Sequence, residues 1–438
     1  MAQLKIPSLF LIIGLGIQSL HAASEAKIQS LADRETPSLV RLYTHLHSNP
    51  ELSLREVKTA ERIGKELEDA GFVVTYNVGG HGLVGILKNG DGPIVMVRTD
   101  LDGLPVTEDT GLEYASKVHA KDLQGRDVGL MHACGHDVHM TCFIGTARLL
   151  SQLKQHWRGT VLMVGQPAEE ISVGSKAMLA DGLFSRFPLP DYILALHSDA
   201  GLEVGKVRVR PGDAMAGTDN LDVTIRGISG HGAYAYTTKD PIVLSAQTVL
   251  ALQTIVSREI PAVDPAIVTV GSIHGGTKHN VIPEEVRLEM TIRYYSDAVR
   301  ERILTSITRI AKGVAYAGGV PQDREPLVKL RDAESIPPVH NDPELTRRVV
   351  GSIEDILGKE QMLVADPVMG GEDFGVLGRT AEKRPICLFW LGTVDPKKLT
   401  ESAPLPSLHS SRFAPLPEPA IKTGVKAMTA VVINLLAK

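Results

Sequence analysis

The sequence predicts an α/β protein in which a mixed, mostly parallel sheet forms the main domain and a smaller α+β domain is inserted into it. Two patterns support this prediction. Short strands of continuous apolar residues alternate with helical stretches in the outer parts of the chain, as in sheets that are buried on both faces. In the middle of the chain the strands alternate apolar and polar residues, as in antiparallel sheets with one face in water.

The first 23 residues are predicted to be a secretory signal peptide. Lys5 precedes an apolar run over 8–17, and small residues follow at Ala22, Ala23 and Ser24. This run is too short to span a bilayer comfortably, and no other run of about 18 apolar residues follows it. We therefore expect cleavage after Ala22 or Ala23 and an exported protein, periplasmic or secreted, without membrane attachment.

The main domain is predicted from four apolar strands and the helices between them. The strands lie at 93–99, 160–165, 192–196 and 386–391. Two helices occupy 36–63 and are interrupted at Asn49-Pro50, and another helix covers 138–153, where apolar residues recur at helical spacing. These elements assign 24–212 and the C-terminal part of the chain to one domain.

The inserted domain is predicted over 213–325. Its strands at 221–226, 267–273 and 286–292 alternate in character, and a long helical stretch at 241–258 lies between the first two. The main domain then resumes over 326–438.

Composition narrows the possible partners. The 438 residues carry a formal net charge of -5 and only 4% aromatic residues, so neither a basic surface nor a base-stacking platform for nucleic acid is expected. Three cysteines are too few for a disulfide framework in an exported protein of this length. Stability is therefore expected to come from the apolar core.

Polar residues of the kinds that bind metals follow the apolar strands. Arg98–Pro105 follows the first strand, Gln166–Glu170 the second and His197 the third, while His409 comes some distance after the fourth. Active sites of open α/β sheets form beyond the carboxyl ends of the strands. These residues are therefore expected to converge on a single site.

The segment 131–139 is the richest in metal-ligand side chains, with three histidines, one cysteine and one aspartate at the start of a helix. Thiolate, imidazole and carboxylate together suit zinc and similar first-row metals. Glu169 and Glu170 add two adjacent carboxylates, of which one can bind metal while the other faces a substrate water. A solvated acidic turn is the alternative interpretation of that pair.

These segments resemble the amidohydrolase branch of the aminoacylase and carboxypeptidase superfamily of dinuclear metallopeptidases, the branch of hippurate hydrolase and the auxin-conjugate hydrolases. The resemblance runs in order over nearly all of the mature chain. Its segments are 46–53, 98–105, 131–139, 166–170, 195–197, 230–233, 275–283, 370–374 and 408–409.

The resemblance implies a role for each matching residue. Two divalent metal ions per subunit, zinc or manganese with cobalt or nickel also suitable, are implied with Glu169 as the general base. Asp102 and Asp137 are implied as carboxylates that orient ligand imidazoles. The implied ligands are Cys134, His136, Glu170, His197 and His409.

The inserted domain is implied to be a lid through which the subunits form a homodimer. Its His231 and Asn280 are implied to bind the substrate, with His231 stabilising the oxyanion. His279 is a further candidate for substrate contact, whereas His45 and His47 are expected to serve packing. His132 and His139 are expected to form hydrogen bonds around the site.

The implied reaction is hydrolysis of the amide bond of N-acyl amino acids or related small peptides by a metal-activated water. Two alternatives remain open, a metallo-carboxypeptidase or dipeptidase on the same scaffold and an exported metal-binding protein without catalysis. Three departures from the usual family pattern bear on the substrate pocket. Tyr236 replaces a second lid histidine, Gly371 replaces a serine, and 410–413 follows the last ligand with unusual residues.

Overall fold

The computed structural model describes residues 9–122, 124–400 and 402–437, and these form two compact units. The first unit comprises the described residues up to Gly212, together with Asn341–Ala365 and the chain from Thr380 onward; the second comprises Asp213–His340 and Asp366–Arg379. Residues 1–8 of the predicted signal peptide lie outside the described residues. From Leu9 the chain is helical, within α1 (Leu9–Ser48).

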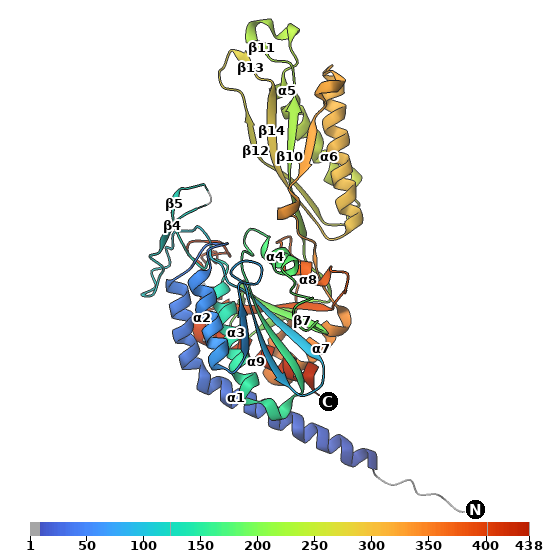
Figure 1. The fold of residues 1–438 in the computed structure, drawn as a ribbon. Coiled ribbons are helices and arrows are strands. Elements are labelled where there is room, and N and C mark those ends of the chain that lie inside the picture. The colour runs from blue at the N-terminus through green and yellow to red at the C-terminus, as the bar shows by residue number, and fades with distance from the viewer. Residues whose placement is uncertain (1–8, 123, 401, 438) are drawn as a thin grey trace, which may run out of the picture. The chain divides into compact units, whose positions relative to one another are not determined.

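The first unit contains an eight-stranded sheet in the order β1-β2-β6-β3-β7-β18-β8-β17 (Figure 1). The four central strands β6, β3, β7 and β18 run parallel, whereas β1–β2, β2–β6 and β18–β8 pair antiparallel. The predicted mixed, mostly parallel sheet is thus confirmed. The strand bounds are β1 (Val73–Tyr76), β2 (Leu83–Asn89), β3 (Ile94–Asp100), β6 (Gly159–Gln166), β7 (Tyr192–Glu203), β8 (Val207–Val209), β17 (Met362–Val364) and β18 (Ile386–Val394).

Helices pack on this sheet to form one apolar core. Besides α1 they are α2 (Val57–Asp69), α3 (His136–Gln152), α4 (Gly174–Ala180), α7 (Pro343–Leu357) and α9 (Pro417–Leu436). The short helix α8 (Gly375–Gly378) belongs to the second unit. Every residue of β6 and β18 is buried, which explains why these strands are continuously apolar in sequence. Among the described helices, α9 alone has the length and apolar composition of a membrane span, but 72% of that window is buried inside the protein.

The second unit contains an antiparallel sheet in the order β12-β14-β10-β15, and the long helices α5 (Pro241–Thr254) and α6 (Asp297–Ala317) pack on it. Burial alternates strictly along most of β14, as its sequence pattern predicts. The strands are β10 (Gly217–Arg226), β12 (Ala266–Gly275), β14 (Glu285–Tyr294) and β15 (Leu327–Leu330), with a short pair β11 (Gly230–His231) and β13 (Val281–Ile282).

The predicted end of the inserted domain at 325 differs from the structure. The second unit continues to His340, because β15 pairs with β10, and it also takes in Asp366–Arg379. A four-residue strand at the edge of a sheet has too short an alternation to be recognised in the sequence. The short strands β1, β8 and β17 of the first unit were not predicted for the same reason, since each has only three or four residues.

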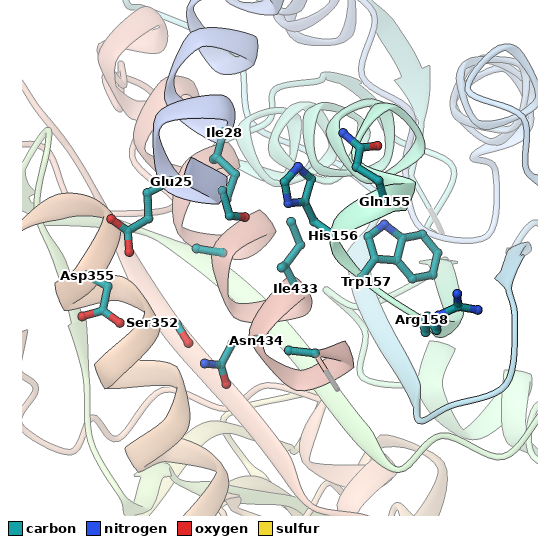
Figure 2. A pocket seen from close by; sticks show the side chains of 13 residues that line it. Glu25, Ile28, Gln155, His156, Trp157, Arg158, Ser352, Asp355, Ile433 and Asn434 are labelled. Carbon is teal, nitrogen blue, oxygen red and sulfur yellow. The ribbon is translucent and has the colours of Figure 1, made fainter. Parts of the chain in front are cut away.

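An open cavity of about 420 Å³ lies in the first unit, away from the polar residues that follow the strands. Glu25, Ile28, Trp157, Asp355 and Asn434 are among its lining residues (Figure 2). None of the predicted site residues lines it. The cavity lies instead between α1 and α9, and residues of both helices line it.

Candidate metal centre

The first unit brings together all five predicted ligands. Cys134 lies in the turn before α3 and His136 is the first residue of that helix. Glu170 follows β6, His197 lies within β7, and His409 lies on the segment between β18 and α9. Parallel strands end at one edge of the sheet, so residues far apart in sequence meet there.

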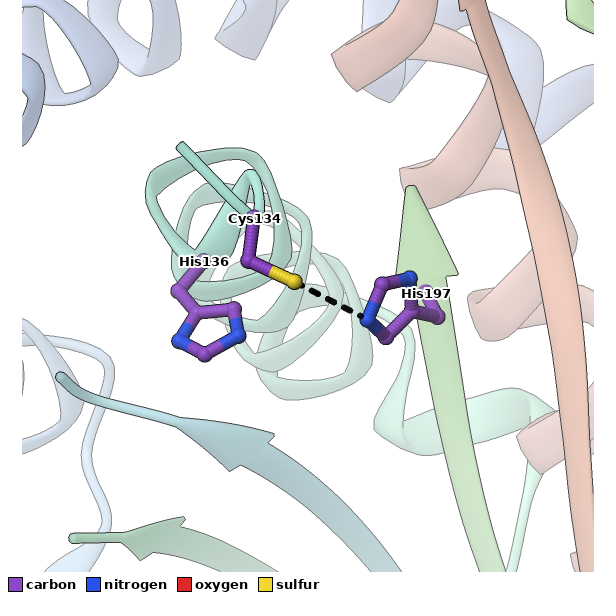
Figure 3. Close-up of side chains that lie close together, drawn as sticks. All are labelled: Cys134, His136 and His197. Carbon is purple, nitrogen blue, oxygen red and sulfur yellow. Dashed lines mark hydrogen bonds between the residues drawn. The ribbon is translucent and has the colours of Figure 1, made fainter. Parts of the chain in front are cut away.

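Cys134 is shared by two groups of potential ligands. With His136 and His197 it offers three ligand atoms within 4.8 Å of one another, and with Glu170 and His409 it offers a second such set. Its Sγ lies 3.5 Å from the Nε2 of His197 and 3.3 Å from the Nε2 of His409. Figure 3 shows the thiol directed toward His197. Cys134 would therefore be available to a cation held by either set.

Backbone carbonyls fix the orientation of two of the imidazoles that are predicted to be ligands. The Nδ1–H of His136 donates to the carbonyl of Asp102 at 2.8 Å, and the Nδ1–H of His197 donates to the carbonyl of Ser198 at 2.8 Å. Because a carbonyl can only accept, each ring carries its proton on Nδ1 and leaves Nε2 free as a ligand. Metal-binding histidines usually have such a partner on the second nitrogen.

Two further atoms of the cluster are suited to bind a cation. The Nε2 of His136 and the Oε1 of Glu170 are buried without a hydrogen-bond partner and lie 3.7 Å apart. Burial raises the pKa of the Cys134 thiol well above its usual range and raises the pKa of the Glu170 carboxyl to about 8. Bound cations would balance the thiolate and carboxylate at this depth. The sulfur, nitrogen and oxygen donors suit zinc and similar divalent ions.

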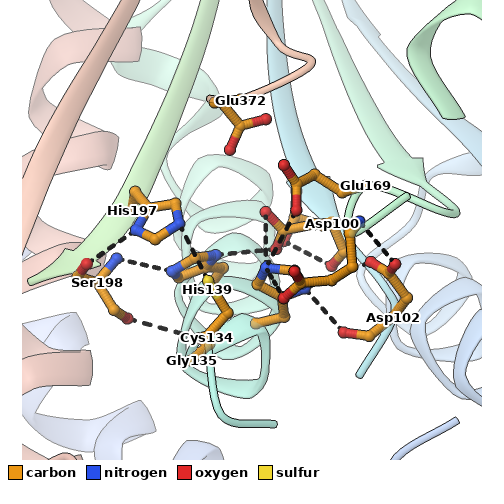
Figure 4. Close-up of polar contacts among 12 residues, drawn as sticks. Asp100, Asp102, Cys134, Gly135, His139, Glu169, His197, Ser198 and Glu372 are labelled. Atoms are coloured by element: carbon orange, nitrogen blue, oxygen red, sulfur yellow. Dashed lines mark hydrogen bonds and ion pairs between the residues drawn. The ribbon is translucent and has the colours of Figure 1, made fainter. Parts of the chain in front are cut away.

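Glu169 lies beside this cluster. It is buried, and its Oε2 is 3.8 Å from the Nε2 of His136. Figure 4 shows its carboxylate on the same side of the site as Glu372 and above the cysteine and histidine side chains in this view. The two adjacent glutamates therefore occupy one site, and a solvated acidic turn is excluded because both are largely buried.

Asp102 contacts both a ligand and the turn that carries the glutamates. Its Oδ1 lies 3.4 Å from the Nδ1 of His136, and its Oδ2 accepts the backbone N–H of Glu170 at 3.0 Å. Asp137 differs from the prediction. Its Oδ2 lies 2.7 Å from the Nδ1 of His47, so the imidazole that it orients is not one of the five ligands.

Sequence reasoning missed a buried chain of contacts centred on Asp100 (Figure 4). Asp100 contacts the Nδ1 of His139 at 2.8 Å and accepts from Arg98 at 2.9 Å. The backbone N–H of Ser198 donates to the Nε2 of His139 at 2.7 Å. Both nitrogens of His139 are thereby occupied, which explains why it holds the strand ends together rather than acting as a ligand. Arg98 and Asp100 were visible in the sequence as charged residues at the end of an apolar strand.

His47 was expected to serve packing, but it lies between two carboxylates. Its ring contacts Asp137 at 2.7 Å and Glu108 at 3.1 Å, and all three side chains are buried. Burial alone opposes the charged imidazolium, but the hydrogen bonds to Asp137 and Glu108 outweigh it and raise the pKa of His47 to about 9. This ion cluster ties α1 to the beginning of α3, one residue from His136.

His231 and Asn280 lie together in the second unit. The pairing of β11 with β13 places them close, and the N–H of Gly232 donates to the carbonyl of Asn280 at 2.9 Å. The Nδ1 of His231 accepts from the N–H of Ala233 at 3.0 Å, so its Nε2 carries the proton. Tyr234 packs against the His231 ring, and Tyr236, which stands in place of a usual histidine, is 86% exposed. His279 also lies exposed on this segment.

A model of the peptidase family M20/M25/M40 matches residues 96–434. The chain belongs to this family. It is therefore a metal-dependent hydrolase, and the resemblance inferred from its motifs is confirmed. Cys134, Glu170 and His409 all fall within the matched range.

Named relatives and solved structures agree with this assignment. The chain is 35% identical over 399 residues to N-acetyldiaminopimelate deacetylase of Limosilactobacillus reuteri, covering 89% of this chain and 96% of that protein. It is 34% identical over 347 residues to IAA-amino acid hydrolase ILR1-like 2 of Arabidopsis thaliana, covering 78% and 74% respectively.

Two solved structures share the fold at 29% sequence identity. One is a protein of methicillin-resistant Staphylococcus aureus described as a putative aminohydrolase, with a TM-score of 0.83 over 94% of this chain and 100% of that one. The other is a Bacillus subtilis protein described as a dinuclear metal binding peptidase from the M20 family, with a TM-score of 0.74 over 92% of this chain and 99% of that one.

The His47 cluster predicts a pH-dependent contribution to stability. Its folded pKa of about 9 lies above the ordinary value of 6.5, so the stabilisation is complete below pH 6.5 and is lost as the pH rises through 9. The shift in the pKa of His47 corresponds to roughly 3 kcal/mol of stabilisation. The same ion pairs lower the pKa values of Asp137 and Glu108, so their shifts are not added to this figure. His47→Gln should therefore destabilise the metal-depleted protein strongly at pH 6 and weakly at pH 9.5.

Urea unfolding of both proteins across this pH range measures the difference. His156→Gln, outside the cluster, is the control and should show no such trend. A stability difference that stays constant from pH 6 to 9.5 would contradict the charged state of His47.

Proposed function

We propose that this protein hydrolyses the amide bond of N-acyl amino acids or related small peptides with two divalent metal ions. The observation that carries the proposal is the pair of ligand sets that share Cys134, with the carboxylate of Glu169 beside them. The names of the relatives, deacetylases and an amino acid conjugate hydrolase, support an acyl-amide substrate. The names of these relatives indicate different acyl groups. The acyl group that this protein prefers therefore has to be determined from its own substrate pocket.

Each residue of the site is assigned one role in the proposed hydrolysis. When bound at the five ligands, two ions lower the pKa of water and polarise the scissile carbonyl. Glu169 accepts the proton of the attacking water and passes it to the leaving amine nitrogen, which needs a buried carboxylate near the reacting atoms. Asp102 holds the His136 ring and the Glu170 backbone in place. His231 carries the Nε2–H donor that the proposal assigns to the oxyanion, and the neighbouring Asn280 is assigned to substrate binding.

The proposed ions are zinc or manganese, with cobalt or nickel as further candidates. Thiolate and imidazole favour zinc, whereas the carboxylate of Glu170 also suits manganese. Activity after adding each metal back to depleted protein, together with the metal content of purified protein, identifies the ion that serves the reaction.

Glu169→Gln should bind two metal ions and lose activity. The amide keeps the shape of the side chain but cannot take the proton, so kcat should fall on the order of 100-fold to 10,000-fold. Release of free amino acid is measured from N-acetyl and N-benzoyl amino acids and from unblocked dipeptides, with metal content measured by mass spectrometry. Release from the dipeptides alone would favour a dipeptidase.

The matched control is Glu61→Gln, which changes an exposed carboxylate of α2 in the same unit. It should retain wild-type kcat and both ions. A Glu169→Gln enzyme with wild-type kcat would remove Glu169 from the mechanism. A folded wild-type protein with two ions and no release from any substrate would favour the non-catalytic alternative.

We propose further that the second unit forms a homodimer. Its sheet ends in the edge strand β12, where Ile267 and Ile273 are exposed, and α5 exposes Ile242, Val243 and Leu250. An open strand edge beside several exposed large apolar side chains is typical of an interaction surface.

Ile273→Lys should convert a dimer into a monomer, because it places a charge on that strand edge. Light scattering after size-exclusion chromatography measures the mass, with Val364→Lys in the first unit as a control at a more exposed apolar position. A wild-type protein that elutes as a monomer contradicts the proposal.

We also propose that the chain is exported, to the periplasm or outside the cell, after removal of its first 22 or 23 residues. Ile28 is the first residue of α1 that belongs to the apolar core of the described residues. Cleavage after residue 22 or 23 therefore removes none of these core side chains.

Mass spectrometry of the protein recovered from a producing cell should therefore find Ala23 or Ser24 at the N-terminus. Leu11→Arg, which interrupts the apolar run, should leave the chain unprocessed. Recovery of the wild-type chain with its first 22 residues intact contradicts export by this route.

A further inference from the structure

Glu56 is a fully buried carboxylate with no part in the mechanism derived above. It lies just before α2, on the segment that follows the Asn49-Pro50 interruption. Its Oε1 accepts two backbone N–H groups, from Leu54 at 2.9 Å and from Ala168 at 2.8 Å. The second of these belongs to the turn that carries the two catalytic-site glutamates. A carboxylate 112 residues away in sequence therefore holds that turn.

Both residues that donate to Glu56 have a left-handed backbone. The φ angle of Leu54 is 67° and that of Ala168 is 52°. Residues with a Cβ rarely adopt this conformation, so a surrounding interaction has to hold it. A single oxygen of Glu56 supplies that interaction to both residues.

Ala168 directly precedes Glu169, so its backbone conformation sets the direction of the turn from which both glutamates project. Two residues further, the N–H of Glu170 donates to Asp102 at 3.0 Å. Alternate amides of this turn are thus held by two buried carboxylates from different parts of the chain. Ser53 closes the arrangement, because its hydroxyl donates to the same oxygen of Asp102 at 2.6 Å.

We propose that Glu56 is a positioning residue for the reaction, which fixes the turn at 167–170 and through it the carboxylates of Glu169 and Glu170. This inference rests on the function proposed above. Misplacement of a catalytic group by about 1 Å can lower the rate on the order of 100-fold. The turn at 167–170 therefore has to be held rigidly. Glu56, which lies outside the segment 166–170, provides the hydrogen bond that holds it.

Glu56 acts as a hydrogen-bond acceptor, since both of its partners are backbone amides. Its other oxygen, Oε2, is buried without a hydrogen-bond partner. Burial, together with the nearby charge of Asp102, raises the pKa of Glu56 to about 7, so the neutral form is readily reached. A glutamine keeps an oxygen at Oε1 and should therefore replace the glutamate, whereas an alanine leaves two amides of strained residues without an acceptor.

The test compares Glu56→Ala with Glu56→Gln. For Glu56→Ala we expect two bound ions, a KM within about threefold of wild type and a kcat lowered on the order of 100-fold. Glu56→Gln should keep kcat within about threefold. Glu51→Ala is the matched control, because the Glu51 carboxylate on the same segment accepts from the N–H and hydroxyl of Thr59 near the start of α2 and not from the turn at 167–170. It should lower stability without lowering kcat.

Hydrogen exchange provides a readout that does not depend on activity. A peptide covering 166–172 should take up deuterium faster in Glu56→Ala than in wild type, Glu56→Gln or Glu51→Ala. Wild-type exchange of this peptide in Glu56→Ala overturns the inference even if no substrate is found. If Glu56→Ala does not fold, a folded Glu56→Gln that loses more than tenfold in kcat or exchanges faster overturns it.

The same assays separate the two proposals. A wild-type protein that releases no amino acid contradicts the proposed function, while the exchange result still decides the role of Glu56. An active wild type with an equally active Glu56→Ala contradicts the inference alone.

Discussion

Burial of a thiol and several carboxylates at one end of a parallel sheet is the constraint on which the site depends. Cys134, Glu170 and Glu169 are largely removed from water, and Asp100 and Asp102 lie directly behind them. So much negative charge can be ionised at this depth only if cations balance it. Arg98 supplies part of that balance through Asp100, and the two sets of ligand atoms that share Cys134 could hold cations that supply the rest.

Hydrogen bonds to the backbone then fix the orientation of the histidine rings in the site. Carbonyls fix the tautomers of His136 and His197, and the N–H of Ser198 occupies the remaining nitrogen of His139. Among these three histidines, His136 and His197 therefore direct an unprotonated Nε2 toward the predicted metal site, and His139 does not. The difference lies in which atoms of the strand ends each ring meets, since all three rings have the same chemistry.

The anchors of the site are spread widely along the chain. His47 on α1 and Glu56 before α2 connect the N-terminal segment to α3 and to the turn after β6. Sequence position gives little indication of this, because each contact spans about 90 residues or more. Buried carboxylates make both of these connections, since Asp137 joins α3 to α1 and Glu56 joins the turn after β6 to the segment before α2.

The sequence by itself determined the α/β class and the long central strands, because buried strands are continuously apolar. Its family motifs predicted five metal ligands, and the structure brings those five residues together. It did not determine the short edge strands such as β15, whose pattern is too brief, or the partners of Asp137, Asp100 and Glu56. Those partners come from segments that only folding brings together. A side chain's type shows what it can bind, whereas its buried neighbours, which exclude water and satisfy particular atoms, decide what it does bind.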